Sequence, residues 1–262
     1  MDLNEPDYLS VTELAGDDVT SEQVERICHR YYWAGKYCID KDVLEVACGT
    51  GQGIGYLAGL ARSVKAGDYT AEMLDIARNH YKDRFDFLQF DAQEMPFEDQ
   101  CFDVVIIFEA SYYLPDAERF VAECARVLRP NGVVLLATAN KDLFDFNPSP
   151  YSHVYHGTEE LQQLFAKEGF STECFGYMPV EALSLKQKIL RPVKKFAVEM
   201  GLIPKTMAGK KLLKKLVFGG LISMPAEIRP EMYDYKEPEK LDCALPDTRH
   251  KVIYCAARKG GV

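Results

Sequence analysis

The sequence predicts an α/β protein built on a doubly wound, mostly parallel sheet. Apolar runs typical of buried strands alternate along the chain with segments of helical periodicity, and turn signals separate them. Alternation of this kind produces a parallel sheet with helices on both faces. With 262 residues and 47% hydrophobic content, the chain is long enough for one substantial core and an insertion.

The order of the elements follows from periodicity and turn signals. The expected strands are five apolar runs at residues 43–47, 63–67, 86–90, 104–108 and 133–138. Helical patterns lie between them near residues 53–62, 71–81 and 116–128. Thr20 and Gln23 have the spacing of a capping box, which predicts a helix over about residues 21–35. Thr158 is expected to cap a further helix that stops at Gly169.

The net charge of −9 is unevenly spread along the chain. Between Lys186 and Lys215 there are ten Lys or Arg and one acid, so this segment carries +9 and the remainder −18. A globally acidic protein is a poor candidate for general nucleic-acid binding, and we expect no nucleic-acid partner.

The N-terminal residues MDLNEPDYLS lack the basic and then apolar layout of a secretion signal. No apolar run approaches the ~20 residues that span a bilayer. The eight cysteines are scattered, without a CxxC pair or a Cys/His cluster of metal-binding spacing. We therefore expect a cytoplasmic protein with reduced cysteines and no metal.

A glycine-rich stretch, VLEVACGTGQG, covers the first expected strand and the turn after it. Gly49, Gly51 and Gly53 stand at alternate positions, where they let a ligand approach the backbone closely. The spacing is not the G-x-G-x-x-G of nicotinamide-binding proteins, and a phosphate-binding G-x-x-x-x-G-K-[ST] loop is absent.

Polar residues follow the next strands at the same edge of the expected sheet. Asp68 ends the second strand, where a carboxylate can accept two hydrogen bonds from a ribose diol. Asp91 ends the third strand and can accept from the exocyclic amine of adenine, while Ala92 or Gln93 offers a backbone N–H to a ring nitrogen. With Phe108 at the end of the fourth strand, successive strand ends suit one adenosine-containing ligand.

Four stretches, VLEVACGTGQG, GDYTAEML, FDAQEMPFEDQCFDVV and RVLRPNGVVLLAT, resemble in order and spacing the class I S-adenosylmethionine-dependent methyltransferases of type 11. The resemblance implies an enzyme with a seven-stranded Rossmann-like sheet, S-adenosylmethionine as cofactor and S-adenosylhomocysteine as product. We expect the chain to divide into a helical cap over residues 1–35, a core over 36–178 and 248–262, and a basic helical insertion over 179–247. The insertion departs from the family, in which the last two strands usually form a short hairpin.

The resemblance further implies roles for individual residues. The expected cofactor-binding residues are Tyr31, Glu45, Ala47, Gly49, Thr50, Gly51, Asp68, Tyr69, Met73, Asp91, Ala92, Gln93 and Phe108. Glu45 stands where the family often has Asp, which keeps the charge. Arg30 is expected to meet the carboxylate of the cofactor, with a solvated helix charge as the alternative. Tyr69 and Met73 are also open to being core residues.

Methyl transfer from a sulfonium is an in-line displacement, so positioning can supply much of the rate. A hydroxyl acceptor also profits from a general base, for which the candidates are His153, His156 and Glu109. A structural or surface role is the alternative for each histidine. Tyr112 and Tyr113 are expected to line the acceptor pocket. The expected function is methylation of a small-molecule or glycan-linked acceptor at oxygen, with two alternatives: N-methylation of a small amine, or cofactor binding without catalysis.

The insertion separates the expected sixth strand, about residues 173–177, from the seventh, about residues 251–255. The sixth strand is expected to run parallel to its neighbours, which places the insertion beside the substrate pocket. Its lysine-rich, amphipathic pattern has three interpretations: a lid packed on the core, a cationic lid for an anionic substrate, or a helix pair resting on an acidic membrane. The oligomeric state is left open.

Overall fold

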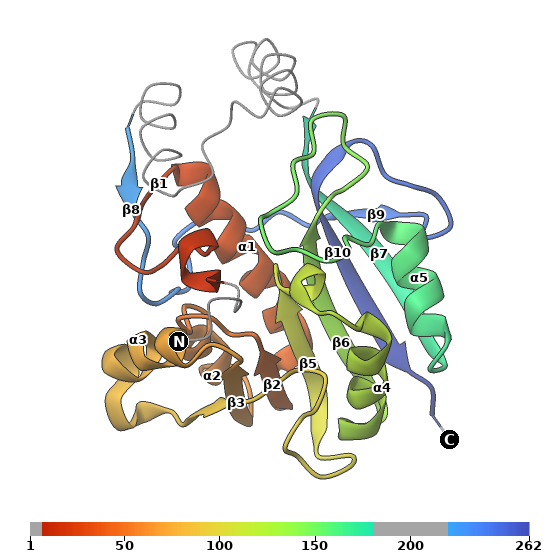
Figure 1. Ribbon diagram of the computed structural model, residues 1–262, viewed down its shortest axis with the longest axis horizontal. Coiled ribbons are helices and arrows are strands. Elements are labelled where there is room, and N and C mark those ends of the chain that lie inside the picture. The colour runs from red at the N-terminus through yellow and green to blue at the C-terminus, as the bar shows by residue number, and fades with distance from the viewer. Residues whose placement is uncertain (1–6, 181–219, 262) are drawn as a thin grey trace.

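A central sheet of eight strands organises the part of the chain that the computed structural model describes, residues 7–180 and 220–261. Helices cover both faces of this sheet (Figure 1). The expected α/β class and the doubly wound, mostly parallel sheet are confirmed. The expectation of seven strands was one short, because a short strand from the insertion extends one edge.

The elements lie close to the expected ranges. The strands of the main sheet are β2 (Asp42–Val46), β3 (Ser63–Asp68), β4 (Phe87–Gln89), β5 (Phe102–Phe108), β6 (Leu128–Ala139), β7 (Phe170–Pro179), β9 (Glu239–Leu241) and β10 (His250–Lys259). The α-helices are α1 (Ser21–Cys38), α2 (Ile54–Ala58), α3 (Ala71–Tyr81), α4 (Ala117–Val127) and α5 (Thr158–Ala166). Smaller elements are β1 (Asp18–Val19), β8 (Ile222–Ser223) and the 3₁₀ turns η1 (Tyr8–Val11), η2 (Lys82–Arg84) and η3 (Ser111–Tyr113).

The strands follow the order β4-β3-β2-β5-β6-β10-β7-β9 across the sheet. Strands β4 to β6 pair in parallel, and the three pairings beyond β6 are antiparallel. The prediction that the sixth strand, β7, runs parallel to its neighbours was therefore wrong, because β10 enters the sheet between β6 and β7. Strand β7 still runs in the direction of β6, so it ends at the edge where β2, β3 and β5 end.

Helix boundaries follow local hydrogen bonds. The capping box of α1 is confirmed, since Gln23 N donates to Thr20 Oγ1 at 3.3 Å and Thr20 N donates to Gln23 Oε1 at 3.0 Å. The expected cap of α5 was wrong by one residue: Gly157 is the N-cap, and its N–H donates to Glu160 Oε2 at 3.0 Å. Thr158 instead donates its hydroxyl to a backbone carbonyl in the loop before β10.

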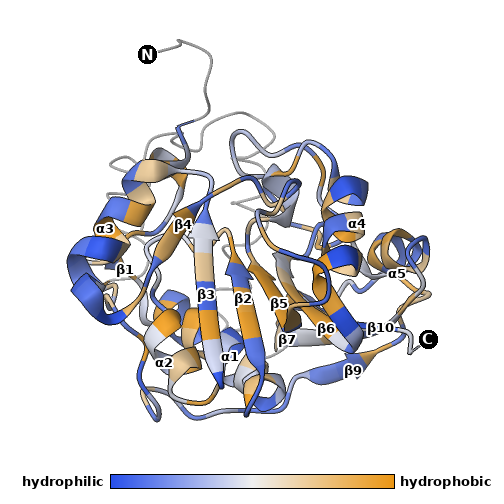
Figure 2. Cartoon of the chain, turned by 90° about the horizontal axis from the view of Figure 1, so that it is seen from below, coloured by the Kyte–Doolittle hydropathy of each residue, from blue (hydrophilic) through white to orange (hydrophobic). Residues whose placement is uncertain are grey.

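Two apolar clusters lie on opposite faces of the sheet. One packs α1 against the central strands, and the other packs α4 and α5 against the opposite face. The neighbouring residues Ile106 and Ile107 of β5 belong to different clusters, and both are fully buried. Such a strand is buried on both faces, as the continuous apolar run in its sequence indicates (Figure 2).

The described part of the insertion is extended and acidic rather than helical and basic. Residues 220–237, which we call the strap, run along α1. Tyr32 Oη donates to Arg229 O at 2.7 Å, and His29 Nε2 donates to Lys236 O at 2.5 Å. Strand β8 of the strap pairs with β1, so the N-terminal residues are tied to it. The lysine-rich stripes of the sequence lie outside the described residues.

None of the helices within residues 7–180 and 220–261 combines the length and the apolar character needed to cross a membrane.

Candidate functional site

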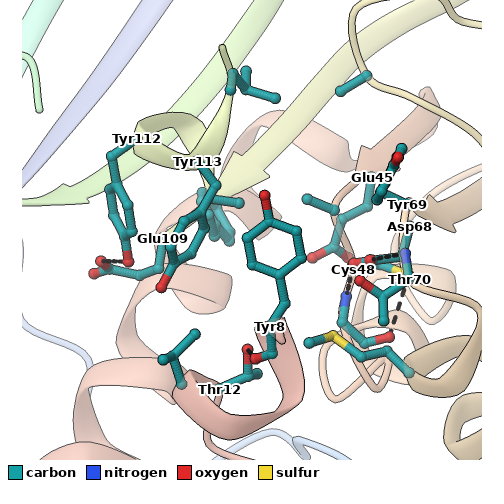
Figure 3. A pocket seen from close by; sticks show the side chains of 18 of the residues that line it. Tyr8, Thr12, Glu45, Cys48, Asp68, Tyr69, Thr70, Glu109, Tyr112 and Tyr113 are labelled. Atoms are coloured by element: carbon teal, nitrogen blue, oxygen red, sulfur yellow. Dashed lines mark hydrogen bonds between the residues drawn. The ribbon is translucent and has the colours of Figure 1, made fainter. Parts of the chain in front are cut away.

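A cavity of about 490 Å³ opens at the carboxyl ends of β2, β3 and β5, under the N-terminal turn η1 and beside α1. Its volume is in the range of small-molecule sites. Side chains from η1, from the ends of β2 and β3 and from the residues after β5 point into it (Figure 3). The site therefore lies where a doubly wound sheet is expected to bind its ligand.

The glycine loop forms one wall of the cavity, but its glycines serve different purposes. Gly49, with φ of +58°, lines the cavity beside Met73. Gly51 does not line it, because a Cβ there would point to Tyr81 and Phe87 at 3.2 Å. At Gly53 a Cβ would lie only 1.9 Å from the ring of Tyr31, so this glycine lets the ring approach the loop.

Asp68 joins the end of β3 to the glycine loop. Its Oδ2 accepts from Gly49 N and its Oδ1 from Thr70 N, both at 2.8 Å. Burial raises the pKa of this carboxyl, and the backbone N–H groups of Thr70 and Gly49 oppose that rise. Each carboxylate oxygen accepts one backbone N–H and has a further lone pair that can accept a hydrogen bond. Two such oxygens side by side suit the two hydroxyls of a ribose.

Asp91 is held by its neighbour Gln93. The Gln93 backbone N–H and its Nε2 both donate to Asp91 Oδ1, at 2.8 and 3.0 Å. Gln93 Oε1 accepts from the backbone N–H of Asp116, the N-cap of α4, at 2.7 Å. The Gln93 N–H is thus engaged within the loop, which leaves Ala92 as the expected donor to an adenine ring nitrogen.

Glu45 and Arg30 line the cavity, and each has a buried polar atom without a hydrogen-bond partner among the described residues. Glu45 Oε1 accepts from Tyr31 Oη at 2.5 Å, whereas its Oε2 has no hydrogen-bond partner there, and neither has Arg30 Nε. A buried polar atom is costly unless it is paired. An acidic and a basic side chain with spare hydrogen-bonding capacity in one cavity suit the ammonium and carboxylate of a methionine moiety, so the residues fit the expected cofactor.

The opposite side of the cavity carries Glu109 and a group of tyrosines. Glu109 has φ of +53°, a conformation rare for a residue with a side chain, and it turns away from the end of β5. Its Oε2 accepts from Tyr112 Oη at 3.4 Å, and its Oε1 lies 3.9 Å from Arg30 Nη1. Tyr113 hydrogen bonds through its Oη to Ser149 Oγ at 2.6 Å.

Most of the residues expected at the site line this one cavity. They are Tyr31, Glu45, Ala47, Gly49, Asp68, Tyr69, Met73, Asp91, Ala92, Gln93, Phe108, Glu109, Tyr112, Tyr113 and His153. Three expected residues, Thr50, Gly51 and His156, are not among its lining. Burial lowers the pKa of His156, which lies near Glu160 and Lys141 at the start of α5. His153 is exposed at the rim, and its backbone N–H donates to Tyr112 O at 2.7 Å.

Several lining residues were missed from the sequence. The polar or aromatic ones are Tyr8, Thr12, Glu13, Arg26, Gln52, Thr70, Phe90 and Ser149. Arg26 could have been found, because it precedes Arg30 by four residues and so lies on the same face of α1. Tyr8 carried no signal, because it sits in a four-residue turn without periodicity. Among the described residues no group of three His, Cys, Asp or Glu could hold a metal.

Comparison with known proteins agrees with this geometry. Residues 44–136 match a family model described as a methyltransferase domain. These residues form a class I S-adenosylmethionine-dependent methyltransferase domain. The match spans β2 to β6 and so includes the glycine loop, Asp68 and Asp91. S-adenosylmethionine is the cofactor that this family implies.

Similar proteins cover part of the chain. A probable S-adenosylmethionine-dependent methyltransferase of Mycolicibacterium smegmatis is 35% identical over 153 residues, which are 57% of this chain and 56% of that protein. The phthiotriol/phenolphthiotriol dimycocerosates methyltransferase 1 of Mycobacterium ulcerans is 45% identical over 101 residues, 36% of each chain. The chain thus spans about half or less of the length of the curated relatives it matches.

The fold is shared with solved structures at low identity. The YcgJ protein of Bacillus subtilis has a TM-score of 0.58 and 17% identity, over 89% of this chain and 99% of that one. At this identity the likeness shows the Rossmann-like fold alone, and the chemistry has to be argued from the site.

Proposed function

We propose that the chain transfers the methyl group of S-adenosylmethionine to the oxygen of a small-molecule or glycan-linked acceptor. The cofactor would lie between the glycine loop, Asp68 and Asp91, with Glu45 and Arg30 toward its amino-acid end. The acceptor would lie on the side of Glu109. In the reaction, the cofactor supplies an activated methyl group, and the protein aligns the acceptor with it and removes a proton.

The position of Glu109 is the observation that carries this proposal. Its carboxylate lies inside the cavity, between the hydroxyl of Tyr112 and the guanidinium of Arg30. Tyr112 is buried, and burial raises the pKa of its hydroxyl well above the ordinary value, so it stays a neutral hydrogen-bond donor. The Glu109 carboxylate thus lies where it can take the proton of an acceptor hydroxyl. His153 stands farther out, at the rim.

The relatives support the acceptor class in general terms. The M. ulcerans relative is named for phthiotriol and phenolphthiotriol dimycocerosates, which are neither proteins nor nucleic acids. The net charge of −9 is in keeping with a small-molecule acceptor rather than nucleic acid. A cytoplasmic location stays a prediction. Contact between the lysine-rich segment and an acidic membrane stays a prediction as well.

The experiment is a screen with methyl-labelled S-adenosylmethionine against phenols, sugar alcohols, nucleotide sugars and amines. We expect label in hydroxyl acceptors, and a loss of about 10²–10⁴-fold in kcat for Glu109→Gln with little change in cofactor affinity. Glu118→Gln, an exposed acid on α4 paired with Lys167, is the matched control.

Label in amines alone, with Glu109→Gln as active as the native chain, would show N-methylation instead. Tight cofactor binding without transfer to any acceptor would show a binding protein.

A further inference from the structure

Tyr8 stands in the cavity at a place that the proposed reaction leaves unexplained. Its ring lies between the side that carries Glu45 and Asp68 and the side that carries Glu109 and Tyr113 (Figure 3). An acceptor held against Glu109 would have to meet the methyl group across the position that this ring fills. The ring therefore occupies space that the reaction needs.

The Tyr8 ring is packed as an aromatic ligand would be. It meets Tyr113 edge to face, with ring centroids 5.1 Å apart and an angle of 61° between the planes. Tyr113 in turn meets Tyr112 at 4.6 Å, which stacks on Tyr155 at 4.1 Å. Aromatic pairs favour this edge-on geometry. The tyrosines form a wall suited to a flat ring.

The Tyr8 hydroxyl lies near the residues expected to bind the cofactor. Burial, with the charges on Tyr69, Asp91 and Asp68, raises the pKa of this hydroxyl, which is therefore neutral. Tyr8 thus brings an aromatic ring and a phenolic oxygen to the boundary between the two sides of the cavity.

The turn that carries Tyr8 is held by local hydrogen bonds. None of the residues of η1 is buried. Ser10 N donates to Asp7 Oδ1 at 3.2 Å at its start, and Thr12 donates its N–H and Oγ1 to Tyr8 O at 3.1 and 2.8 Å at its end. The chain is anchored farther on, where Gly16 N donates to Met224 O of the strap at 2.8 Å. A short, partly exposed turn ahead of an anchored segment can open without disturbing the core.

The charges on the acceptor side balance one another. Arg30 faces Glu109, and Arg26 lies among acids. Burial acts to lower the pKa of Arg26, but Glu13 and Glu109 outweigh it and raise that pKa. A charged acceptor would therefore disturb an existing balance, whereas an uncharged one would not.

We propose that Tyr8 fills the acceptor position, and that the acceptor is an uncharged phenol whose ring replaces that of Tyr8 against Tyr113. This inference rests on the proposed methyl transfer and names its acceptor class. The phenolic oxygen forms a bond to the methyl carbon as the carbon–sulfur bond breaks. The sulfur keeps the electron pair, and the phenolic proton passes to the Glu109 carboxylate.

The test uses 4-methylphenol, which carries the ring, the hydroxyl and the first side-chain carbon of tyrosine. Tyr8→Ala should remove the competitor, since an occluded site weakens apparent binding. In the S-adenosylhomocysteine complex, we expect this variant to bind 4-methylphenol at least about tenfold more tightly than the native chain does. We also expect the variant to bind toluene, which lacks the hydroxyl, more weakly than it binds 4-methylphenol. With S-adenosylmethionine it should form 4-methylanisole faster than the native chain.

Tyr155→Ala is the matched control. Tyr155 belongs to the same aromatic group, but its ring does not line the cavity. This variant should show no gain in 4-methylanisole. Equal binding of 4-methylphenol by Tyr8→Ala and the native chain, or an equal gain in Tyr155→Ala, would overturn the inference.

The two proposals fail in different ways. Transfer to other acceptors without a gain for 4-methylphenol in Tyr8→Ala would end the acceptor assignment alone. Tighter 4-methylphenol binding by Tyr8→Ala, with no transfer to any acceptor, would support the position of the aromatic site and contradict the methyl transfer.

Discussion

The hydroxyl of Tyr31 donates to Glu45 Oε1 at 2.5 Å, and this bond ties helix α1 to strand β2 at the floor of the cavity. Glu45 is 2% exposed, and its burial raises the pKa of the carboxyl from an ordinary 4.5 to about 7. Gly53 leaves room for the Tyr31 ring. Burial thus raises the pKa of an acid at the expected cofactor site, and the hydrogen bond from Tyr31 opposes that rise.

Glu45 should make stability depend on pH in a definite direction. An acid whose pKa is higher in the folded chain than in the unfolded one binds protons on folding, so stability is greatest below pH 4.5 and falls as the pH rises to about 7. At ~1.4 kcal/mol per pKa unit, the rise from 4.5 to about 7 corresponds to a loss of about 3–3.5 kcal/mol. Urea unfolding across this range should show that loss in the native chain relative to Glu45→Gln.

Glu72→Gln, an exposed acid in the first turn of α3, should leave the pH dependence unchanged. A native chain and a Glu45→Gln variant with parallel pH profiles would show that the buried carboxyl is not perturbed.

Gly53→Ala should loosen the joint between α1 and the glycine loop. The added Cβ would lie 1.9 Å from the Tyr31 ring, so the ring has to move and its bond to Glu45 is disturbed. Overpacking of this kind costs about 1–3 kcal/mol, measured by urea unfolding. Gly59→Ala is the control, because the nearest atom to its Cβ would be 3.4 Å away. Equal stability of the two variants would speak against a close Tyr31 contact.

Asp68→Asn should weaken cofactor binding. The amide keeps an oxygen for one of the two backbone N–H groups, but it loses the charge that holds a ribose diol. Hydrogen bonds to charged groups contribute about 1.5–3 kcal/mol, which corresponds to roughly 10–100-fold in the Kd of S-adenosylhomocysteine. Calorimetry measures this Kd, and the control is Asp75→Asn, which changes an exposed acid on α3. An equal loss of affinity in both variants would show an unspecific charge effect.

The core of the fold could be predicted because its strands are buried on both faces. The run around Ile106 and Ile107 is apolar throughout, and such runs between helical patterns indicate a parallel sheet. The pairing of β10 between β6 and β7 depends on contacts distant in sequence, which periodicity does not record. The same holds for the extended strap, whose docking on α1 depends on Tyr32 and His29.

The site was predictable where residues follow strands and hidden where they do not. Asp68 and Asp91 stand at strand ends, so the parallel sheet brings them to one edge. Gly51 shares the glycine pattern, yet it faces Tyr81 and Phe87, because only the three-dimensional path of the turn decides which glycine meets the ligand. Tyr8 reaches the cavity from a short turn that no sequence period reveals.

A crystal structure of the chain with S-adenosylhomocysteine would locate the cofactor site. The ribose hydroxyls should lie within hydrogen-bond distance of Asp68, the adenine beside Asp91 and Ala92, and the amino-acid end toward Glu45 and Arg30. Density for the ligand outside this cavity, or an empty cavity at a saturating ligand concentration, would contradict the assignment of the cofactor site.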